Sequence, residues 1–146
     1  MLFFLKILIL NGPNLNLLGM REPDLYGKKT YADLMKEIKA HAEKVGVEVA
    51  FLQSNHEGIL VDAIQDAVGK YDGIVFNPAA YTHTSVALLD AVKAVGIPTV
   101  EVHITDPMQR EEFRRVSFIR SACIGTIVGH GFAGYCEAID LLLSKK

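Results

Sequence analysis

Short, almost continuous apolar runs alternate along this chain with longer segments in which apolar residues recur every three or four positions. Apolar runs of this length, bounded by turn-forming residues, are typical of parallel strands that are covered on both faces. Five such runs predict five strands, at Leu5–Leu10, Val47–Leu52, Gly73–Phe76, Thr99–His103 and Ile124–Val128.

The segments between these runs have the periodicity of helices that pack one face against a sheet. The first helix is expected to begin after Thr30, a capping residue that has Asp33 three positions later. Three helices are expected to end at a glycine, as helices often do. These glycines are Gly46, Gly69 and Gly96. A short polar helix is predicted over Gln109–Arg115, and a last helix is predicted over Gly134–Ser144.

Strands that alternate with helices imply right-handed crossovers and a parallel sheet. With 146 residues, the chain is expected to form one domain over residues 1–146. The predicted fold class is α/β, a flavodoxin-like three-layer sandwich whose five-stranded parallel sheet has the order 2-1-3-4-5. Ligands of this fold bind at the carboxyl ends of strands 1 and 3, so the residues that follow Leu10, Phe76 and His103 are expected to meet.

Composition narrows the classes of function. Hydrophobic residues make up 50% of the chain and charged residues 22%, and the formal net charge is −2. Basic residues form no stripe or patch, so neither nucleic acid nor a membrane is an expected partner. The apolar N-terminus is interrupted by Lys6 and has no cleavage-site pattern, which favours a cytoplasmic location. Cys123 and Cys136 stand alone, so we expect small buried side chains rather than a zinc site or a disulfide.

The segment Asn11–Gly27 is a long irregular stretch between the first strand and the first helix. Loops of this length in compact domains are usually lids or binding loops. This one holds Arg21 and Tyr26, and a nearby guanidinium lowers the pKa of a phenol from about 10 by roughly 1–3 units. Such a phenol can act as a general base. The alternative is a surface arginine and a tyrosine that anchors the loop.

Glu101 and His103 form a second candidate pair. They are two residues apart in a predicted strand, so their side chains point to the same face. A carboxylate behind an imidazole can fix its tautomer and favour its protonated form. The sequence therefore indicates a catalytic pair, and a structural pair at a sheet edge is the alternative.

The segment after the third strand adds polar candidates. Asn77 stands where its amide can face the crevice, and for His83 a ligand contact and a surface position are equally open. Thr82, Thr84 or Ser85 is expected to cap the next helix. Arg114 and Arg115 are expected by default to lie on a solvated helix face.

Three glycines after the last strand form the pattern G-x-G-x-x-G, at Gly129, Gly131 and Gly134. A dinucleotide site needs a further strand and an acidic residue about 20 positions later, and too few residues follow. We therefore expect a tight turn with close helix–sheet packing. A flavin- or nucleotide-binding module and a non-catalytic interaction domain stay as alternatives for the whole chain.

Several motifs, in this order, resemble type II 3-dehydroquinate dehydratase over about Leu8 to Leu143. They are Asn11–Gly19 with Arg21–Pro23 and Tyr26–Gly27, Gln53–Gly58, Asn77–Pro78 with Tyr81–Ser85, and Glu101–His103. The resemblance implies a cofactor-free and metal-free lyase that removes water from 3-dehydroquinate by anti elimination through an enolate, giving 3-dehydroshikimate. It also implies a homo-oligomer, a dodecamer built of four trimers.

The resemblance also assigns roles to single residues. Tyr26, activated by Arg21, would take the C2 proton, and His103, oriented by Glu101, would protonate the departing C1 hydroxyl. Asn14 would hold a water that supports the enolate oxygen. The remaining contacts would come from Asn77, His83 and Arg114 to substrate hydroxyls, from the backbone N–H groups of Ile104 and Thr105 to the carboxylate, and from Asp90 to a neighbouring subunit's site.

The chain departs from the usual family pattern at three positions. Ala79 stands where a glycine is common, and Thr105-Asp106 replaces the usual Ser-Asn. Thr105 keeps a hydroxyl and an N–H, so the carboxylate pocket is expected to survive. Asp106 adds negative charge near an anionic substrate, which is expected to affect affinity rather than activity.

Overall fold

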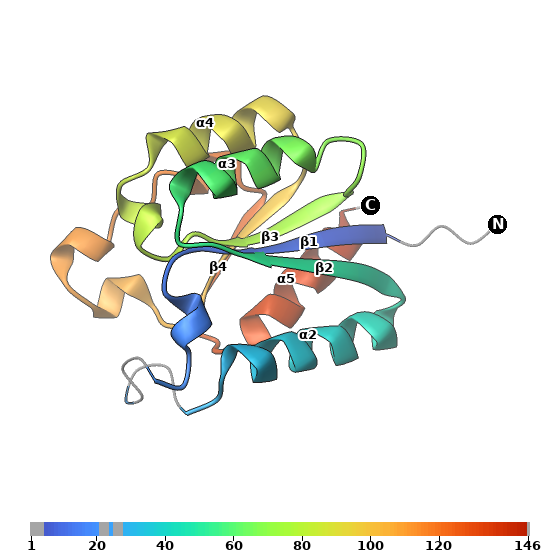
Figure 1. Ribbon diagram of the computed structural model, residues 1–146, viewed down its shortest axis with the longest axis horizontal. Coiled ribbons are helices and arrows are strands. Elements are labelled where there is room, and N and C mark those ends of the chain that lie inside the picture. The colour runs from blue at the N-terminus through green and yellow to red at the C-terminus, as the bar shows by residue number, and fades with distance from the viewer. Residues whose placement is uncertain (1–4, 21–23, 25–27, 146) are drawn as a thin grey trace.

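The computed structural model describes residues 5–20, 24 and 28–145. Its parallel strands form one sheet in the order β2-β1-β3-β4-β5, as predicted. The strands are β1 (Leu5–Asn11), β2 (Val47–Gln53), β3 (Gly73–Asn77), β4 (Thr99–His103) and β5 (Gly125–Val128). The helices are α2 (Tyr31–Val45), α3 (Glu57–Asp66), α4 (Val86–Val95) and α5 (Ala133–Ser144). Figure 1 shows α2 and α5 on one face of the sheet and α3 and α4 on the other, which gives three layers.

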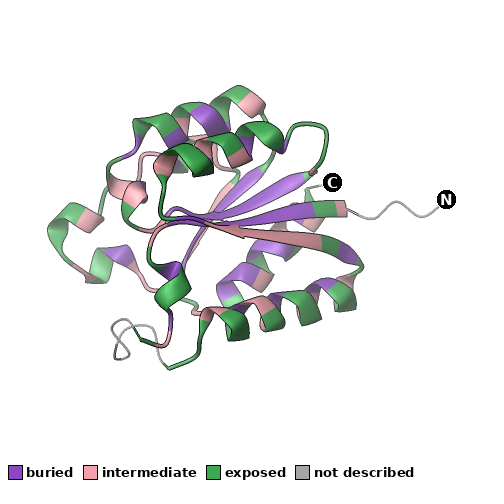
Figure 2. Ribbon diagram, viewed as in Figure 1, coloured by how far each residue is buried: buried purple, intermediate pink, exposed green. Residues whose placement is uncertain are grey.

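Each face of the sheet has its own apolar core, because neighbouring residues of a strand point in opposite directions. On β1, Ile7 and Ile9 pack with residues of α2 and α5, whereas Leu8 and Leu10 pack with residues of α3 and α4. The central strands are buried and the edge strands are partly exposed, as Figure 2 shows. The ends of the central strands are therefore held from both sides.

Local sequence explains where the helices begin and end. The Thr30 side chain accepts the backbone N–H of Asp33, and the Asp33 carboxylate accepts the backbone N–H of Thr30, which forms a capping box at the start of α2. These hydrogen bonds lower the pKa of Asp33. Ser85 Oγ accepts a backbone N–H in the first turn of α4, so Ser85 is the cap among the three candidates Thr82, Thr84 and Ser85. Gly46 and Gly96, both left-handed, end α2 and α4.

The polar helix predicted over Gln109–Arg115 is wrong. The chain instead makes two short 3₁₀ turns, Pro107–Gln109 and Glu112–Arg114, with extended backbone at Glu111 between them. The single large apolar residue of the segment, Phe113, is 66% exposed, so no apolar stripe packs against the sheet. Short helices depend on such packing for their stability, and this segment has none to offer.

The glycine-rich turn between β5 and α5 has the role expected from its sequence. Gly129 and Gly131 have φ values of 77° and 61°, a backbone conformation that suits glycine. A Cβ on Gly134 would lie 3.3 Å from the Ile127 side chain, so the glycine lets α5 approach the sheet. Within the described part of the chain, no helix combines the length and apolar character that crossing a bilayer requires.

Candidate active site

A pocket opens at the carboxyl ends of β3 and β4, one strand along from the crevice predicted at strands 1 and 3. The segments after Leu10, Phe76 and His103 meet in it, as predicted. The space inside it, which is open to solvent, measures about 430 Å³. It is lined by Leu15, Asn77, Ala79, Ala80, His83, His103, Ile104, Thr105, Pro107, Arg110 and Arg114. Arginine and histidine side chains beside an amide suit a hydroxylated, anionic ligand. The pocket therefore joins residues from three separate connections of the fold.

The connections after β1 and β3 meet at very close range. Asn11 and Asn77 are partners in the parallel register, and the Gly12 N–H donates to the Asn77 carbonyl at 2.8 Å. A Cβ on Gly12 would lie 2.3 Å from the Pro78 carbonyl oxygen, a distance that no side chain tolerates. Glycine at this position lets the long loop after β1 start directly against the floor of the pocket.

Asn77 is held in one orientation by a buried chain of hydrogen bonds. Its Nδ2 donates to the Tyr135 hydroxyl at 3.0 Å, and that hydroxyl donates to Asn11 Oδ1 at 2.6 Å. Asn11 Nδ2 in turn donates to the Tyr31 hydroxyl at 3.3 Å, at the start of α2. Burial raises the pKa of Tyr135 far above its usual value, so this phenol stays neutral and acts as a fixed donor and acceptor.

The backbone beside Asn77 is unusual. Ala79 has a φ of 53°, in the left-handed region that residues other than glycine rarely adopt. Its N–H donates to Asn77 Oδ1 at 3.0 Å, so the left-handed residue also fixes the amide. The conformation gives a physical reason why a glycine is common at this position in the family that the chain resembles.

Glu101 and His103 form a buried pair, as predicted. His103 Nε2 donates to Glu101 Oε2 at 2.6 Å, and the Glu101 side chain is 0% exposed. The strand β4 lies between β3 and β5, so the pair is inside the sheet and not at its edge. Glu101 therefore fixes His103 at the wall of the pocket, with Nδ1 as the ring nitrogen left to meet a ligand.

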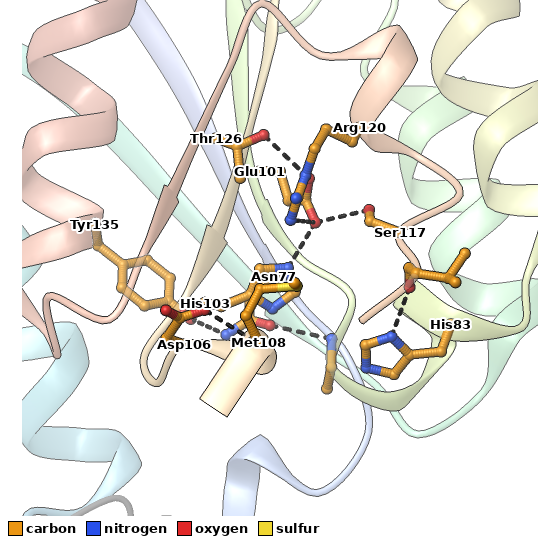
Figure 3. A network of polar contacts seen from close by, with 12 residues as sticks. Asn77, His83, Glu101, His103, Asp106, Met108, Ser117, Arg120, Thr126 and Tyr135 are labelled. Carbon is orange, nitrogen blue, oxygen red and sulfur yellow. Dashed lines mark hydrogen bonds and ion pairs between the residues drawn. The ribbon is translucent and has the colours of Figure 1, made fainter. Parts of the chain in front are cut away.

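Other donors also converge on Glu101, as Figure 3 shows. Ser117 and Thr126 donate their hydroxyls to it at 2.8 and 3.1 Å, and Arg120 Nε donates to Oε1 at 3.0 Å. Burial alone would raise the pKa of Glu101, but hydrogen bonds from His103, Arg120 and Ser117 outweigh it and lower the pKa to about 2. The carboxylate is thus a permanent acceptor.

His83 lies in the pocket wall as a neutral histidine. Its Nδ1 donates to the Val116 carbonyl at 2.7 Å, which leaves Nε2 as an acceptor. Burial lowers the pKa of His83, and the charges of His103 and Arg114 lower it further. A neutral acceptor beside Arg114 can accept a ligand hydroxyl. His83 therefore lies at the pocket wall, and its contact with a ligand stays a prediction.

The segment after β4 completes the pocket. Ile104 and Thr105 line it, as does Arg114, whose Nε also donates to Glu111 at 2.5 Å. Asp106 does not line it, because its Oδ1 accepts the Met108 N–H at 2.9 Å and caps the 3₁₀ turn that follows. The added carboxylate is thus hydrogen-bonded to the protein's own backbone.

Three described candidates are absent from the lining of this pocket: Asn14, Asp90 and the fully buried Glu101. Asn14 is exposed and left-handed, its N–H donates to Asn55 Oδ1, and only its neighbour Leu15 lines the pocket. Asp90 is exposed on α4, outside the lining. Arg21 and Tyr26 lie outside the described residues.

The cysteines are half-buried rather than fully buried, and both are free thiols. Burial, together with the nearby Glu101 charge, raises the pKa of Cys123 to about 12, and burial with nearby carboxylates raises that of Cys136 to about 11. Neither thiol is a nucleophile at neutral pH. Across residues 5–20, 24 and 28–145, no three His, Cys, Asp or Glu side chains gather closely enough to hold a metal ion.

Sequence reasoning missed several residues of the site. Thr126 pairs with Glu101 in the β4–β5 register, so correct strand alignment alone would have found it. Arg120 and Ser117 lie in irregular chain, where periodicity gives no position. Tyr135 matched the apolar stripe of the last helix, and nothing in that pattern marks its hydroxyl as the partner of Asn77.

The chain also matches known proteins along almost its whole length. The model of the family "Dehydroquinase class II" matches residues 5–143. A 3-dehydroquinate dehydratase of Corynebacterium glutamicum is 57% identical over 141 residues, 97% of each chain, and one of Clostridium acetobutylicum is 54% identical over 138 residues, 94% of this chain and 96% of that one. The crystal structure of a type II dehydroquinase from Butyrivibrio crossotus has a TM-score of 0.94 at 48% identity and covers 96% of this chain and 98% of its own. Because the family model and these relatives match almost the whole chain, the chain belongs to the class II dehydroquinase family.

Proposed function

We infer that this protein is a 3-dehydroquinate dehydratase, a hydro-lyase that removes water from 3-dehydroquinate to give 3-dehydroshikimate. Family membership and relatives of this name over 97% of the chain support the activity. The single structural observation that supports it best is the buried Glu101–His103 pair at the wall of a pocket with arginine, histidine and amide side chains. We propose anti elimination through an enolate, with no metal or cofactor taking part.

His103 is the proposed general acid. A departing hydroxide is a poor leaving group unless it is protonated, and an imidazolium within hydrogen-bond reach can supply that proton. The His103 Nε2–H is already committed to Glu101 at 2.6 Å, so the proton for the C1 hydroxyl would come from Nδ1. Glu101 remains ionised and stabilises the positive charge before the transfer.

Tyr26 is the proposed general base, with Arg21 as its activator. The C2 hydrogen lies next to a ketone, so its removal produces an enolate that needs a stabilised oxygen. A tyrosinate made accessible by a neighbouring cation can remove it at neutral pH. Both residues come from the loop after β1, and we propose that closure of this loop over the pocket brings them opposite His103 and excludes water. Asn14 would hold the water that supports the enolate oxygen.

Substrate binding would use the rest of the pocket. Asn77, His83 and Arg114 line it and are proposed to hold substrate hydroxyls. The backbone N–H groups of Ile104 and Thr105, directly after β4, are proposed to hold the carboxylate. The fixed Asn77 amide and the neutral His83 ring are preorganised for this role, because their own hydrogen bonds already set their orientation.

Asp90 is proposed to act in the pocket of a neighbouring subunit, since it is exposed on α4 and outside its own pocket. We propose a homo-oligomer, a dodecamer built of four trimers, on the basis of the family resemblance. A cytoplasmic location and a place in the shikimate pathway, toward aromatic amino acids, are proposed on the same basis.

The activity is tested by adding 3-dehydroquinate to the purified protein and following the ultraviolet absorbance of the enone product. An increase that scales with protein concentration is expected, and a folded protein that gives none removes the assignment. Tyr26→Phe is expected to abolish turnover while the protein still binds 3-dehydroshikimate. Tyr71→Phe, at a half-buried tyrosine outside the pocket lining, is the matched control. A near-normal rate for Tyr26→Phe would remove the base assignment and leave the reaction itself intact.

A further inference from the structure

We propose that Arg120 is a positioning residue for the reaction: its guanidinium keeps Glu101 ionised through the catalytic cycle and so sets the pH range over which His103 carries its proton. The inference deepens the proposed function, because it concerns the residue assigned there as the general acid. It concerns a side chain that is not part of the pocket lining and that, in the proposed mechanism, does not touch the substrate.

The carboxylate of Glu101 is shared between two cations. His103 Nε2 lies 2.6 Å from Oε2 on the pocket side, while Arg120 approaches with Nε 3.0 Å from Oε1 and Nη2 3.4 Å from Oε2 (Figure 3). Both oxygens therefore face the guanidinium, in the two-point arrangement that fits arginine and carboxylate. Glu101 is 0% exposed and the Arg120 side chain is 44% exposed, so the arginine links a buried charge to solvent.

The position of Arg120 is fixed by the chain around it. It follows Ile119, which is 0% exposed in the core beneath α3 and α4, and it begins the 3₁₀ turn Arg120–Ala122. The N–H of Ala122 donates to the Ile119 carbonyl and that of Cys123 to the Arg120 carbonyl. A turn anchored in the core holds the guanidinium against Glu101 although much of the arginine is exposed.

A second cation matters because His103 gives up its charge. Once His103 has passed a proton to the leaving group, Glu101 would be a buried carboxylate with no cation beside it, a costly state that favours taking up a proton. An arginine stays protonated at every pH at which the enzyme works. With Arg120 in place, Glu101 remains an ionised acceptor in both states of His103, and the Nε2 proton of the neutral imidazole stays on His103 rather than passing to the carboxylate.

The same charge acts on His103 itself. The Arg120 guanidinium partly neutralises the Glu101 carboxylate, which would otherwise stabilise the His103 imidazolium more strongly. The positive charge of Arg120 also repels the positive charge of protonated His103. Removing it therefore favours protonated His103. The other groups near the pair, His83, Arg114 and Arg110 in the pocket wall and the neutral Cys123 thiol, stay in place when only Arg120 is changed.

The test follows the pH titration of His103 by NMR in protein labelled with ¹⁵N-histidine, assigned by His103→Gln. In Arg120→Gln the midpoint is expected to rise by about 0.5–1 pH unit, a size limited by the solvent that screens a half-exposed arginine. The alkaline limb of the kcat profile is expected to move by the same amount. Arg120→Lys, which keeps the charge, is expected to restore most of the normal midpoint. A midpoint for a folded Arg120→Gln within 0.2 unit of the unchanged protein, on the order of measurement error, overturns the proposal.

Arg115→Gln is the matched control, because it removes the same charge from an exposed arginine directly after the 3₁₀ turn Glu112–Arg114 and is expected to leave the midpoint unchanged. A second measurement needs no variant that might not fold. In unchanged protein labelled with ¹³C-glutamate, the Glu101 carboxyl, assigned by Glu101→Gln, is expected to stay ionised throughout the titration of His103. A Glu101 signal that shows proton uptake in that range overturns the proposal. Neither NMR readout needs turnover, so a failed dehydration assay would not decide them.

Discussion

Ala79→Gly is expected to change stability in a way that an ordinary alanine-to-glycine substitution does not. Ala79 has a φ of 53°, and the left-handed conformation costs an L residue about 1–2 kcal/mol. Glycine avoids that cost. It loses about 0.5–1 kcal/mol through the greater freedom of the unfolded chain. The methyl group is partly buried at the edge of the core, and its loss is worth at most about 0.8 kcal/mol. Together these contributions place the net effect of Ala79→Gly between about 0.8 kcal/mol destabilising and about 1.5 kcal/mol stabilising.

The neighbouring residue supplies the control. Ala80 is exposed and is not among the described residues with positive φ, so Ala80→Gly is expected to destabilise by about 0.5–1 kcal/mol. Subtracting the two free energies removes most of the unfolded-chain effect, which is common to both substitutions. Ala79→Gly should then be the more stable variant by about 1 kcal/mol, a difference of roughly 3 °C in the melting temperature of a domain of this size.

The assay is thermal unfolding followed by circular dichroism, with all proteins at one concentration because an oligomer's melting temperature depends on it. If Ala79→Gly melts at the same temperature as Ala80→Gly, or lower, then the left-handed alanine is not strained and the reasoning fails. The result also bears on the site, because the Ala79 N–H holds Asn77 Oδ1. A stable but more mobile glycine at this position should weaken product binding rather than improve it.

Three further predictions follow from single contacts. Gly12→Ala should destabilise the protein by about 2–4 kcal/mol, since its Cβ would meet the Pro78 carbonyl oxygen at 2.3 Å. Urea unfolding measures this loss, and an unchanged unfolding midpoint would contradict the close approach. Tyr135→Phe should cost about 1–3 kcal/mol and weaken 3-dehydroshikimate binding in calorimetry, because Asn77 loses its partner; unaltered affinity would show that the amide needs no support. The pKa of Glu101 is about 2 in the folded protein and 4.5 as a free side chain, so its contribution to stability is complete above pH 4.5 and is lost as the pH falls toward 2. Glu101→Gln should remove that part of the acid dependence in urea unfolding measured from pH 7 to pH 2.5, and an acid profile of unchanged slope would contradict it.

Much of the fold could be predicted because the binary pattern has one consistent solution. The central strands are continuous apolar runs that need cover on both faces, and the segments between them have helical periodicity. Five such strands suggest the flavodoxin-like order 2-1-3-4-5, and that order sets which strand ends meet. The place of the pocket, and the pairing of Glu101 with His103 on one face of β4, both follow from that.

The pattern failed where the chain has no period. The helix predicted over Gln109–Arg115 is absent because its one large apolar residue is exposed, and charge alternation alone does not fold a helix. The carboxylate of Asp106 caps the following turn, a contact that the sequence did not predict, and its expected effect on substrate affinity stays a prediction.

The residues that tune the proposed chemistry are the ones that sequence reasoning is least able to find. A buried carboxylate can be recognised in the sequence of an apolar strand, because its charge must be compensated by a partner. The compensating residue cannot be recognised in this way, because Arg120 has the sequence context of any surface arginine. The anchored turn after Ile119 is what brings Arg120 to Glu101. Sequence can therefore predict that Glu101 needs partners, but the identity of those partners depends on the path of irregular chain. The second partner decides whether Glu101 merely accepts a hydrogen bond or competes with His103 for the proton, so the chemistry of the pair depends on the part of the fold that is hardest to predict.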